Sequence, residues 1–177
     1  MSEAREHRQP AEPASAGRAI IVGLGNPIRA DDAVGLAVAR EVHSRLGDPR
    51  VELCELSVAG LELVERLAGY SHAVVVDAIH NGNRRVGECY RLSLEQGGGS
   101  QRTGSTHELG LLEGVEWARR LGLQMPEVLR VYVVEVADPY VFGAEMSADV
   151  LAAVPRAAEI ILEAEYGHGH AGKATPG

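Results

Sequence analysis

The chain has few sulfur-containing side chains that could form cross-links or bind metals. Only two of its 177 residues are cysteines, Cys54 and Cys89, and each falls in a different expected strand. This spacing is far from C-x-x-C, so neither a disulfide framework nor a thiolate zinc site is expected. Because free cysteine behaves as a small hydrophobe, we expect both residues to be buried, inert thiols.

The sequence also lacks long basic runs and long apolar runs. Its 17 Lys and Arg against 25 Asp and Glu give a formal net charge of −8, and no basic run is longer than two residues. A surface that binds the phosphates of nucleic acid is therefore not expected. No stretch approaches the roughly 18 apolar residues of a membrane-spanning helix, and residues 1–17 lack the apolar core of an export signal. We expect a cytoplasmic protein with no membrane insertion.

The nucleotide-binding motifs are incomplete. Gly23 and Gly25 follow an expected strand, but the third glycine of G-x-G-x-x-G would fall at Ile28. No Gly-Lys-Ser or Gly-Lys-Thr follows, and Pro27 removes a backbone N–H that a phosphate-binding loop would use. The glycines are better explained by a sharp turn that carries Asn26 and the next residues over the edge of a sheet.

Strands and helices alternate regularly between residues 18 and 166. Apolar runs and period-2 patterns predict strands at residues 18–22, 51–56, 73–76, 88–94 and 129–134. Helical periodicity predicts helices at residues 32–46, 59–68, 109–121 and 147–166, with Pro155 as a kink or early break in the last. The alternation predicts a single α/β domain, a three-layer α/β/α sandwich with a mainly parallel sheet of about five or six strands.

The two ends of the chain and one internal stretch lack this periodicity. Residues 1–17 and 167–177 have no apolar pattern, so we expect disorder on both sides of a domain at residues 18–166. Residues 96–104 are rich in glycine and are expected to form a mobile loop.

Three potential metal ligands follow predicted strands or open predicted helices: Asp32, Asp77 and His107. Open α/β sheets bind their ligands beyond the carboxyl ends of the strands, so we expect these side chains to meet there. Two carboxylates and an imidazole are accepted ligands of nickel or zinc, and three protein ligands leave a coordination position open. The sequence therefore predicts a divalent metal site.

Each of the acidic residues also has a structural interpretation. Asp31 is expected to cap the helix that begins beside it, which leaves Asp32 to face the crevice. Asp77 directly follows three valines, and a carboxylate there costs several kcal/mol if it is desolvated and unpaired. It therefore needs a cation or N–H donors, as part of a metal or catalytic site or in a structural turn.

The histidines are weaker candidates when taken singly. Ser105 and Glu108 form a capping-box pattern around His107, and a histidine in a first helical turn is often simply exposed. His80, three residues after Asp77, is a possible fourth ligand. The histidines in residues 168–170 lie in the expected disordered tail and are not counted as ligands.

Several motifs together resemble a known family in content and order. They are Gly23-Leu24-Gly25-Asn26-Pro27, Asp31-Asp32-Ala33-Val34-Gly35, Ala59-Gly60-Leu61-Glu62-Leu63, Val76-Asp77-Ala78-Ile79 and His107-Glu108-Leu109-Gly110-Leu111. The chain resembles the hydrogenase maturation endopeptidases across most of residues 18–166. The resemblance implies an α/β/α enzyme that removes the C-terminal extension of a nickel-iron hydrogenase large-subunit precursor after nickel insertion. It also implies that Asp32, Asp77 and His107 contact the metal and recognise nickel in the substrate.

The sequence shows no evident Ser-His-Asp or Cys-His constellation, so water polarised by a metal is the expected nucleophile. Two alternatives stay open. A non-catalytic nickel chaperone would use the same three ligands to hold the precursor without cutting it. Another metal-dependent hydrolase could use the same sheet on a different substrate.

Overall fold

The computed structural model describes residues 17–57, 60–93, 106–143 and 145–167, with the side chains of residues 106–110 and 112 outside the description. The expected disordered ends, apart from Gly17 and Gly167, lie outside the described residues, as does the expected loop at residues 96–104. Those expectations stay predictions.

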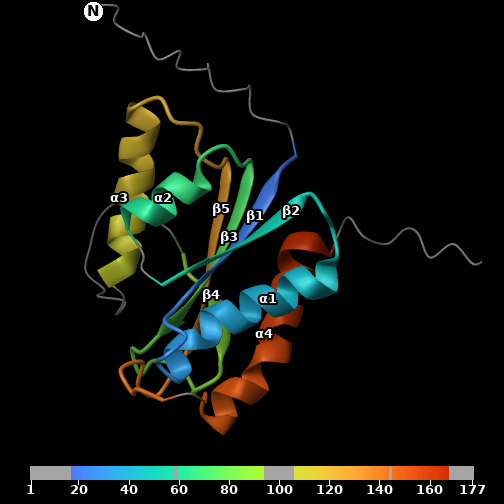
Figure 1. The fold of residues 1–177 in the computed structure, drawn as a ribbon, viewed down its shortest axis with the longest axis vertical. Helices are drawn as coiled ribbons and strands as arrows, with labels where there is room; N and C mark the ends of the chain where they lie inside the picture. The colour runs from blue at the N-terminus through green and yellow to red at the C-terminus, as the bar shows by residue number, and fades with distance from the viewer. Residues whose placement is uncertain (1–16, 58–59, 94–105, 144, 168–177) are drawn as a thin grey trace, which may run out of the picture.

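Five strands form one sheet in the order β2-β1-β3-β5-β4 (Figure 1). Their bounds are Ala19–Leu24 for β1, Val51–Leu56 for β2, His72–Ile79 for β3, Cys89–Arg91 for β4 and Val128–Glu135 for β5. The first three strands and β5 are mutually parallel, and β4 pairs with β5 in the antiparallel sense. The mainly parallel sheet predicted from the sequence is confirmed.

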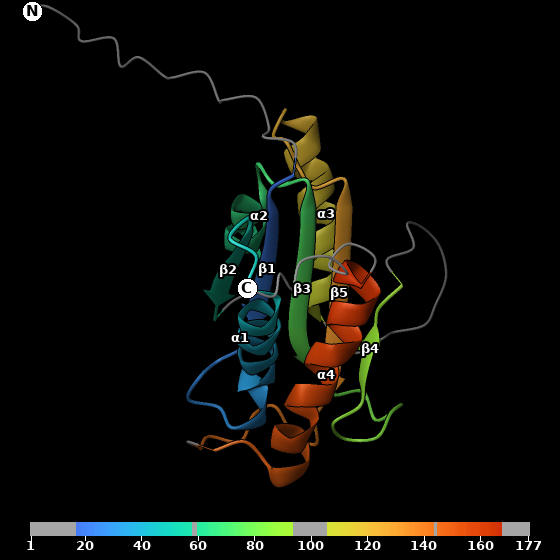
Figure 2. The same cartoon turned by 90° about the vertical axis from the view of Figure 1, so that its right-hand side faces the viewer.

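Helices cover both faces of the sheet (Figure 2). They are α1 (Val34–Leu46), α2 (Leu61–Leu67), α3 (Thr106–Arg120) and α4 (Ala148–Tyr166), with a single 3₁₀ turn, η1 (Asp31–Ala33), before α1. Helices α1 and α4 lie on one face and pack against each other, and α2 and α3 lie on the other. The three-layer sandwich is therefore confirmed.

The central strand β3 shows how the sequence specifies both layers. Val74 and Val76 pack with α1 and α4, whereas Val75 and Ile79 pack on the α2 and α3 side. Because both faces of a parallel sheet are buried, the strand reads as one continuous apolar run.

Some predicted bounds were wrong at the ends. Strand β3 continues past the predicted end at residue 76 to Ile79, so Asp77 lies inside the strand. The extension follows from its neighbour, since β5 stays in register up to the pair Ile79 and Glu135. Strand β4 is three residues long rather than seven. Helix α4 runs without a break through Pro155.

Within the described ranges, no helix is long and apolar enough to span a bilayer.

Candidate active site at the carboxyl edge of the sheet

Asp32 is held by the loop that follows β1. Its Oδ2 accepts a hydrogen bond from the backbone N–H of Asn26 at 2.9 Å, and Asn26 Oδ1 accepts one from Ile28 N–H at 3.1 Å. Gly25 has φ +144°, and a Cβ there would lie 2.0 Å from the carbonyl oxygen of Asp32. The loop therefore requires glycine at this point in order to fold back on η1 and fix Asp32 beyond β1.

Asp77 lies in β3 near the carboxyl edge. Only 8% of its surface is exposed, and its Oδ1 accepts a hydrogen bond from the N–H of Ala78 at 2.8 Å. Alternation along the strand places Asp77 on the same face as Val75 and Ile79, the face that α2 and α3 cover. The side chain is thus a buried carboxylate held by the backbone.

The start of α1 brings these two segments to one corner. A Cβ added to Gly35 would lie 2.2 Å from the carbonyl oxygen of Leu24 and 3.1 Å from Cα of Asp77. Such close approach lets η1 contact β3 as well. Asp32 and Asp77 therefore lie on touching elements at the carboxyl ends of β1 and β3. That their side chains meet stays a prediction.

His107 is the second residue of α3, and its side chain lies outside the described part. Figure 1 shows α3 ending beside the start of β5, so its first turn points toward the carboxyl edge. The side chains that the structure describes contain no group of three His, Cys, Asp or Glu residues able to bind a metal ion. His107 is not among those side chains, so the three-ligand site stays a prediction.

Asp31 does not cap its own helix, and that prediction was wrong. The N-cap of η1 is Ala30, which makes no side-chain cap hydrogen bond. Asp31, only 6% exposed, instead accepts two hydrogen bonds from Ser147: one from the backbone N–H to Oδ1 at 2.6 Å and one from the hydroxyl to Oδ2 at 3.0 Å. Because Ser147 is the N-cap of α4, Asp31 ties the β1 loop to the start of the last helix.

Glu135 is a buried residue at this edge that the sequence analysis missed. It ends β5 with 1% exposure, and its Oε1 accepts hydrogen bonds from Asn81 N–H at 2.9 Å and Gly82 N–H at 2.8 Å. Its Oε2 is buried without a hydrogen-bond partner in the part of the chain that the structure describes. The sequence pattern could have revealed this residue, because Glu135 follows Val133 and Val134 much as Asp77 follows its three valines.

The buried polar residues of the described ranges are all carboxylates: Asp31, Asp77 and Glu135. All three lie at the carboxyl edge, and the structure holds each through backbone N–H groups. They are not close enough to one another to form a metal-binding group of the described side chains. The carboxyl edge therefore carries buried acidic side chains at separate points along it.

His80 also lies near this edge, just after β3. Its ring is exposed, and its Nδ1 donates a hydrogen bond to the carbonyl oxygen of Val136 at 3.0 Å. Histidines that bind metals commonly donate their other N–H to a carbonyl in this way. Its role as a fourth ligand stays a prediction. The histidines of the C-terminal tail lie outside the described residues.

Neither cysteine suits nucleophilic chemistry. Cys54 and Cys89 are free and half-buried, not fully buried as expected. Burial raises the pKa of Cys54 and raises the pKa of Cys89 to about 12. Because the thiolate is the reactive form, both thiols are poor nucleophiles near neutral pH.

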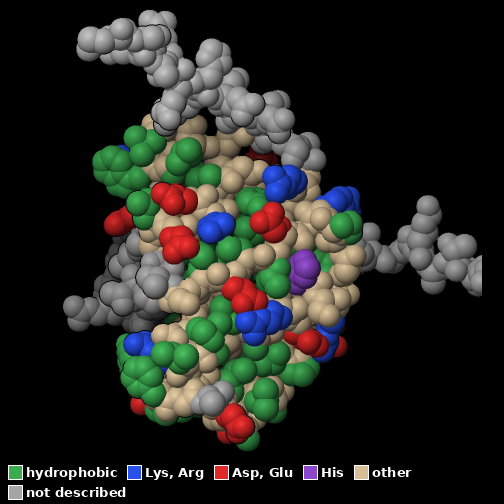
Figure 3. Space-filling view, viewed as in Figure 1, with side chains coloured by type: hydrophobic (Ala, Val, Ile, Leu, Met, Phe, Trp, Pro, Cys, Tyr) green, Lys and Arg blue, Asp and Glu red, His purple; other side chains and the backbone are tan. Residues whose placement is uncertain are grey.

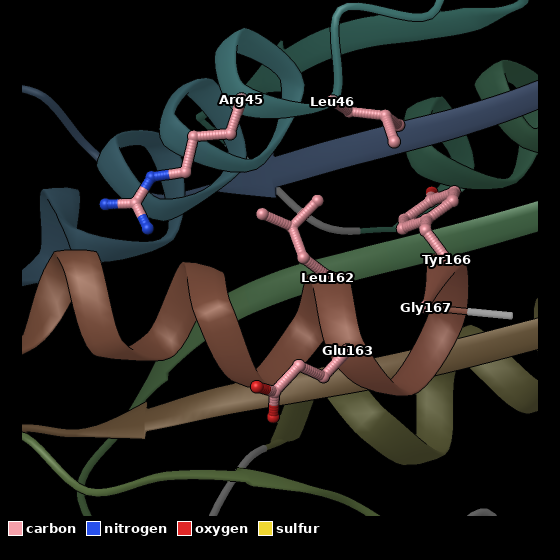
Figure 4. Close-up of a pocket in the computed structure, with 6 residues that line it drawn as sticks. All are labelled: Arg45, Leu46, Leu162, Glu163, Tyr166 and Gly167. Carbon is pink, nitrogen blue, oxygen red and sulfur yellow. The ribbon is translucent and has the colours of Figure 1, made fainter. Parts of the chain in front are cut away.

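A surface cavity of about 260 Å³ lies elsewhere (Figure 4). It is lined by Arg45 and Leu46 at the end of α1 and by Leu162, Glu163, Tyr166 and Gly167 at the end of α4. Asp32 precedes the other end of α1, roughly 20 Å away along a helix of this length. This cavity is therefore separate from the candidate site.

Comparison with known proteins agrees with this architecture. A family model described as hydrogenase maturation protease matches residues 36–164. The hydrogenase 2 maturation protease of Escherichia coli (strain K12) is 27% identical over 128 residues, which cover 70% of this chain and 77% of that protein.

Solved structures of similar proteins share the fold. The hydrogenase maturating endopeptidase HybD from Escherichia coli superposes with a TM-score of 0.61 at 24% identity, covering 86% of this chain and 94% of that one. The [NiFe] hydrogenase maturation protease HycI from Thermococcus kodakarensis KOD1 gives a TM-score of 0.61 at 27% identity, covering 83% and 91%. Since the family model spans well over half of the sequence, the chain belongs to the hydrogenase maturation protease family and is a hydrolytic enzyme.

Proposed function

We propose that this protein removes the C-terminal extension of a nickel-iron hydrogenase large-subunit precursor after nickel has been inserted. The observation that carries the proposal is the contact between η1, which carries Asp31 and Asp32, and β3, which carries Asp77. This contact lies within the fold of a maturation protease. Nickel is then part of the substrate, and the peptide bond to be cut lies near it.

Asp32, Asp77 and His107 are the residues proposed to contact the metal. Two carboxylates and an imidazole suit nickel, and zinc can occupy the same set. An ionised carboxylate offers about four lone-pair positions, so accepting a backbone N–H is compatible with binding a cation. The N–H bonds to Asp32 and Asp77 orient both side chains before the substrate arrives.

The reaction is hydrolysis of an amide. Water adds to the carbonyl carbon, the C–N bond breaks, and the leaving nitrogen takes a proton. A divalent metal supplies positive charge that polarises the water or the carbonyl. The raised pKa of both cysteine thiols argues against a covalent thiol intermediate. If the metal comes with the precursor, cleavage is coupled to nickel insertion.

Three substitutions test the assignment of ligands. Asp32→Asn, Asp77→Asn and His107→Ala should each lower cleavage of the nickel-loaded precursor at least about 100-fold, as expected for loss of a group at the reacting centre. The two Asn variants keep an oxygen that accepts the backbone N–H, so their melting temperatures should stay close to that of the unmodified protein. Cleavage is measured from the rate at which the extension is released.

Glu116→Gln provides the matched control, because Glu116 is an exposed carboxylate on α3. It should cleave at the normal rate. Undiminished cleavage by any one of the three test variants would remove that residue from the site. If the unmodified protein bound the loaded precursor without cutting it, the protein would be a chaperone and not the proposed protease.

A further inference from the structure

Exposed apolar side chains gather beside the candidate site. The exposed fractions are 62% for Ile28, 71% for Tyr140, 51% for Val141 and 70% for Phe142. We call these four residues, together with Arg29, the aromatic patch. Figure 3 shows apolar side chains collected at the lower end of the molecule, where Figure 1 places the β1 loop and the loop after β5. Contiguous apolar surface of this kind commonly marks an interaction site.

Backbone contacts hold the two loops of the patch together. Arg29 and Phe142 form an antiparallel β-bridge, and the N–H of Gly143 donates to the carbonyl oxygen of Ile28 at 3.3 Å. The bonds between Asp31 and Ser147 close the same pair of loops a few residues further on. The two loops of the patch are therefore held in a fixed arrangement by hydrogen bonds.

Arg29 organises the two rings. Its guanidinium carbon lies 5.4 Å from the ring centre of Phe142 and 5.9 Å from that of Tyr140, within cation–π range. Its buried Nε has no hydrogen-bond partner, and the structure gives it no ion pair among the described residues. The patch thus combines apolar rings with a positive charge, on a chain whose net charge is −8.

Two observations point to one kind of occupant. The first is continuity, because Ile28 and Arg29 belong to the loop that also holds Asp32, so a chain bound at the candidate site passes close to the patch. The second is charge: a cation among aromatic rings suits apolar side chains accompanied by a carboxylate. Tyr and Arg are also the residue types that contribute most at protein interfaces.

We propose that the aromatic patch binds a segment of the large-subunit precursor that combines apolar side chains with a carboxylate. The inference rests on the proposed function and extends it from chemistry to substrate recognition. Docking at the patch holds the precursor next to Asp32 and contributes affinity without taking part in bond cleavage.

Steady-state cleavage of the nickel-loaded precursor tests the patch. Phe142→Ala should raise KM about tenfold and leave kcat within about twofold, the effect of losing one substantial interface contact. Tyr140→Ala is a second variant with the same expectation. Arg29→Gln should also raise KM, and it should weaken the dependence of KM on salt.

Leu121→Ala is the matched control, because Leu121 is 77% exposed but follows the far end of α3. It should leave KM unchanged. If the unmodified protein cleaves and both ring variants match this control, the docking proposal is overturned while the proposed function stands. If the unmodified protein cleaves no loaded precursor, the proposed function fails and the docking proposal fails with it.

A second copy of this chain is the other possible occupant of the patch, and sedimentation of the protein alone tests for it. We expect a monomer in both the unmodified protein and the Phe142→Ala variant. A dimer that Phe142→Ala converts to monomers would assign the patch to a second copy of this chain and overturn the proposal.

Discussion

At the scale of the residue, Glu135 shows how a buried charge is accommodated at the sheet edge. One of its oxygens accepts two backbone N–H groups from the turn after β3, while the other has no hydrogen-bond partner in the described part of the chain. That turn follows directly on the strand that carries Asp77. Glu135 therefore fixes the geometry next to the proposed site without being placed in it.

Substitution of Glu135 separates its acceptor role from its charge. Glu135→Ala leaves the N–H groups of Asn81 and Gly82 without their acceptor and should lower the free energy of unfolding by about 2 to 4 kcal/mol. Glu135→Gln keeps an acceptor oxygen and should cost less than about 1 kcal/mol. Urea unfolding measures both. Equal losses in the two variants would mean that the charge of Glu135, and not its hydrogen bonds, stabilises the fold.

Single residues were predictable from sequence where a polar group interrupts an apolar run. Asp77 stood out for this reason, and the structure shows that it is buried. Asp31 was misassigned because capping is a local expectation, whereas its actual partner, Ser147, lies more than a hundred positions away in the chain. No local pattern carries that information.

At the scale of the element, the loop after β1 is tied to the N-terminus of α4. Ser147 donates both its backbone N–H and its hydroxyl to Asp31. The first bond satisfies a donor at the end of a helix, and the second adds a side-chain contact. This pair therefore couples the segment that carries Asp32 to the last helix.

A double-mutant cycle measures this coupling. Asp31→Ala should lower the free energy of unfolding by about 2 kcal/mol, because it removes a charged acceptor from two partly buried hydrogen bonds. Ser147→Ala removes only the hydroxyl bond, and the pair should show a coupling energy of about 1 kcal/mol.

Asp138→Ala is the control for the cycle, since the exposed Asp138 accepts the N–H of Tyr140 at 2.8 Å. It should cost less than about 0.5 kcal/mol, because water replaces that bond at the surface. A coupling near zero between Asp31 and Ser147 would show that the two loops are held together by other contacts.

Element types were easier to predict than element ends. The apolar run at residues 73–76 correctly indicated a buried central strand, but β3 extends to Ile79 because β5 continues to pair with it. Register with a neighbour depends on tertiary contacts that a single segment does not contain. Residues 88–94 illustrate the opposite error, because the strand β4 covers Cys89–Arg91 alone among the described residues of this range.

At the scale of the whole molecule, the sandwich followed from the alternation of strands and helices, and the sheet edge followed from the sandwich. The meeting of η1 with β3 was therefore expected. The aromatic patch was not, because it is built from loops far apart in sequence and its residues look unremarkable in either loop alone. Nothing local predicts which loops will lie side by side.

The proposed substrate of the corner that carries Asp32 and Asp77 is a metal-loaded precursor. The most direct measurement is the intact mass of the large-subunit precursor after incubation with this protein, with and without nickel loaded beforehand. The nickel-loaded precursor should lose one C-terminal peptide of defined mass, and the metal-free precursor should keep its full mass. Equal cleavage of both forms would contradict substrate-borne nickel, and an unchanged mass in both would contradict the proposed activity itself.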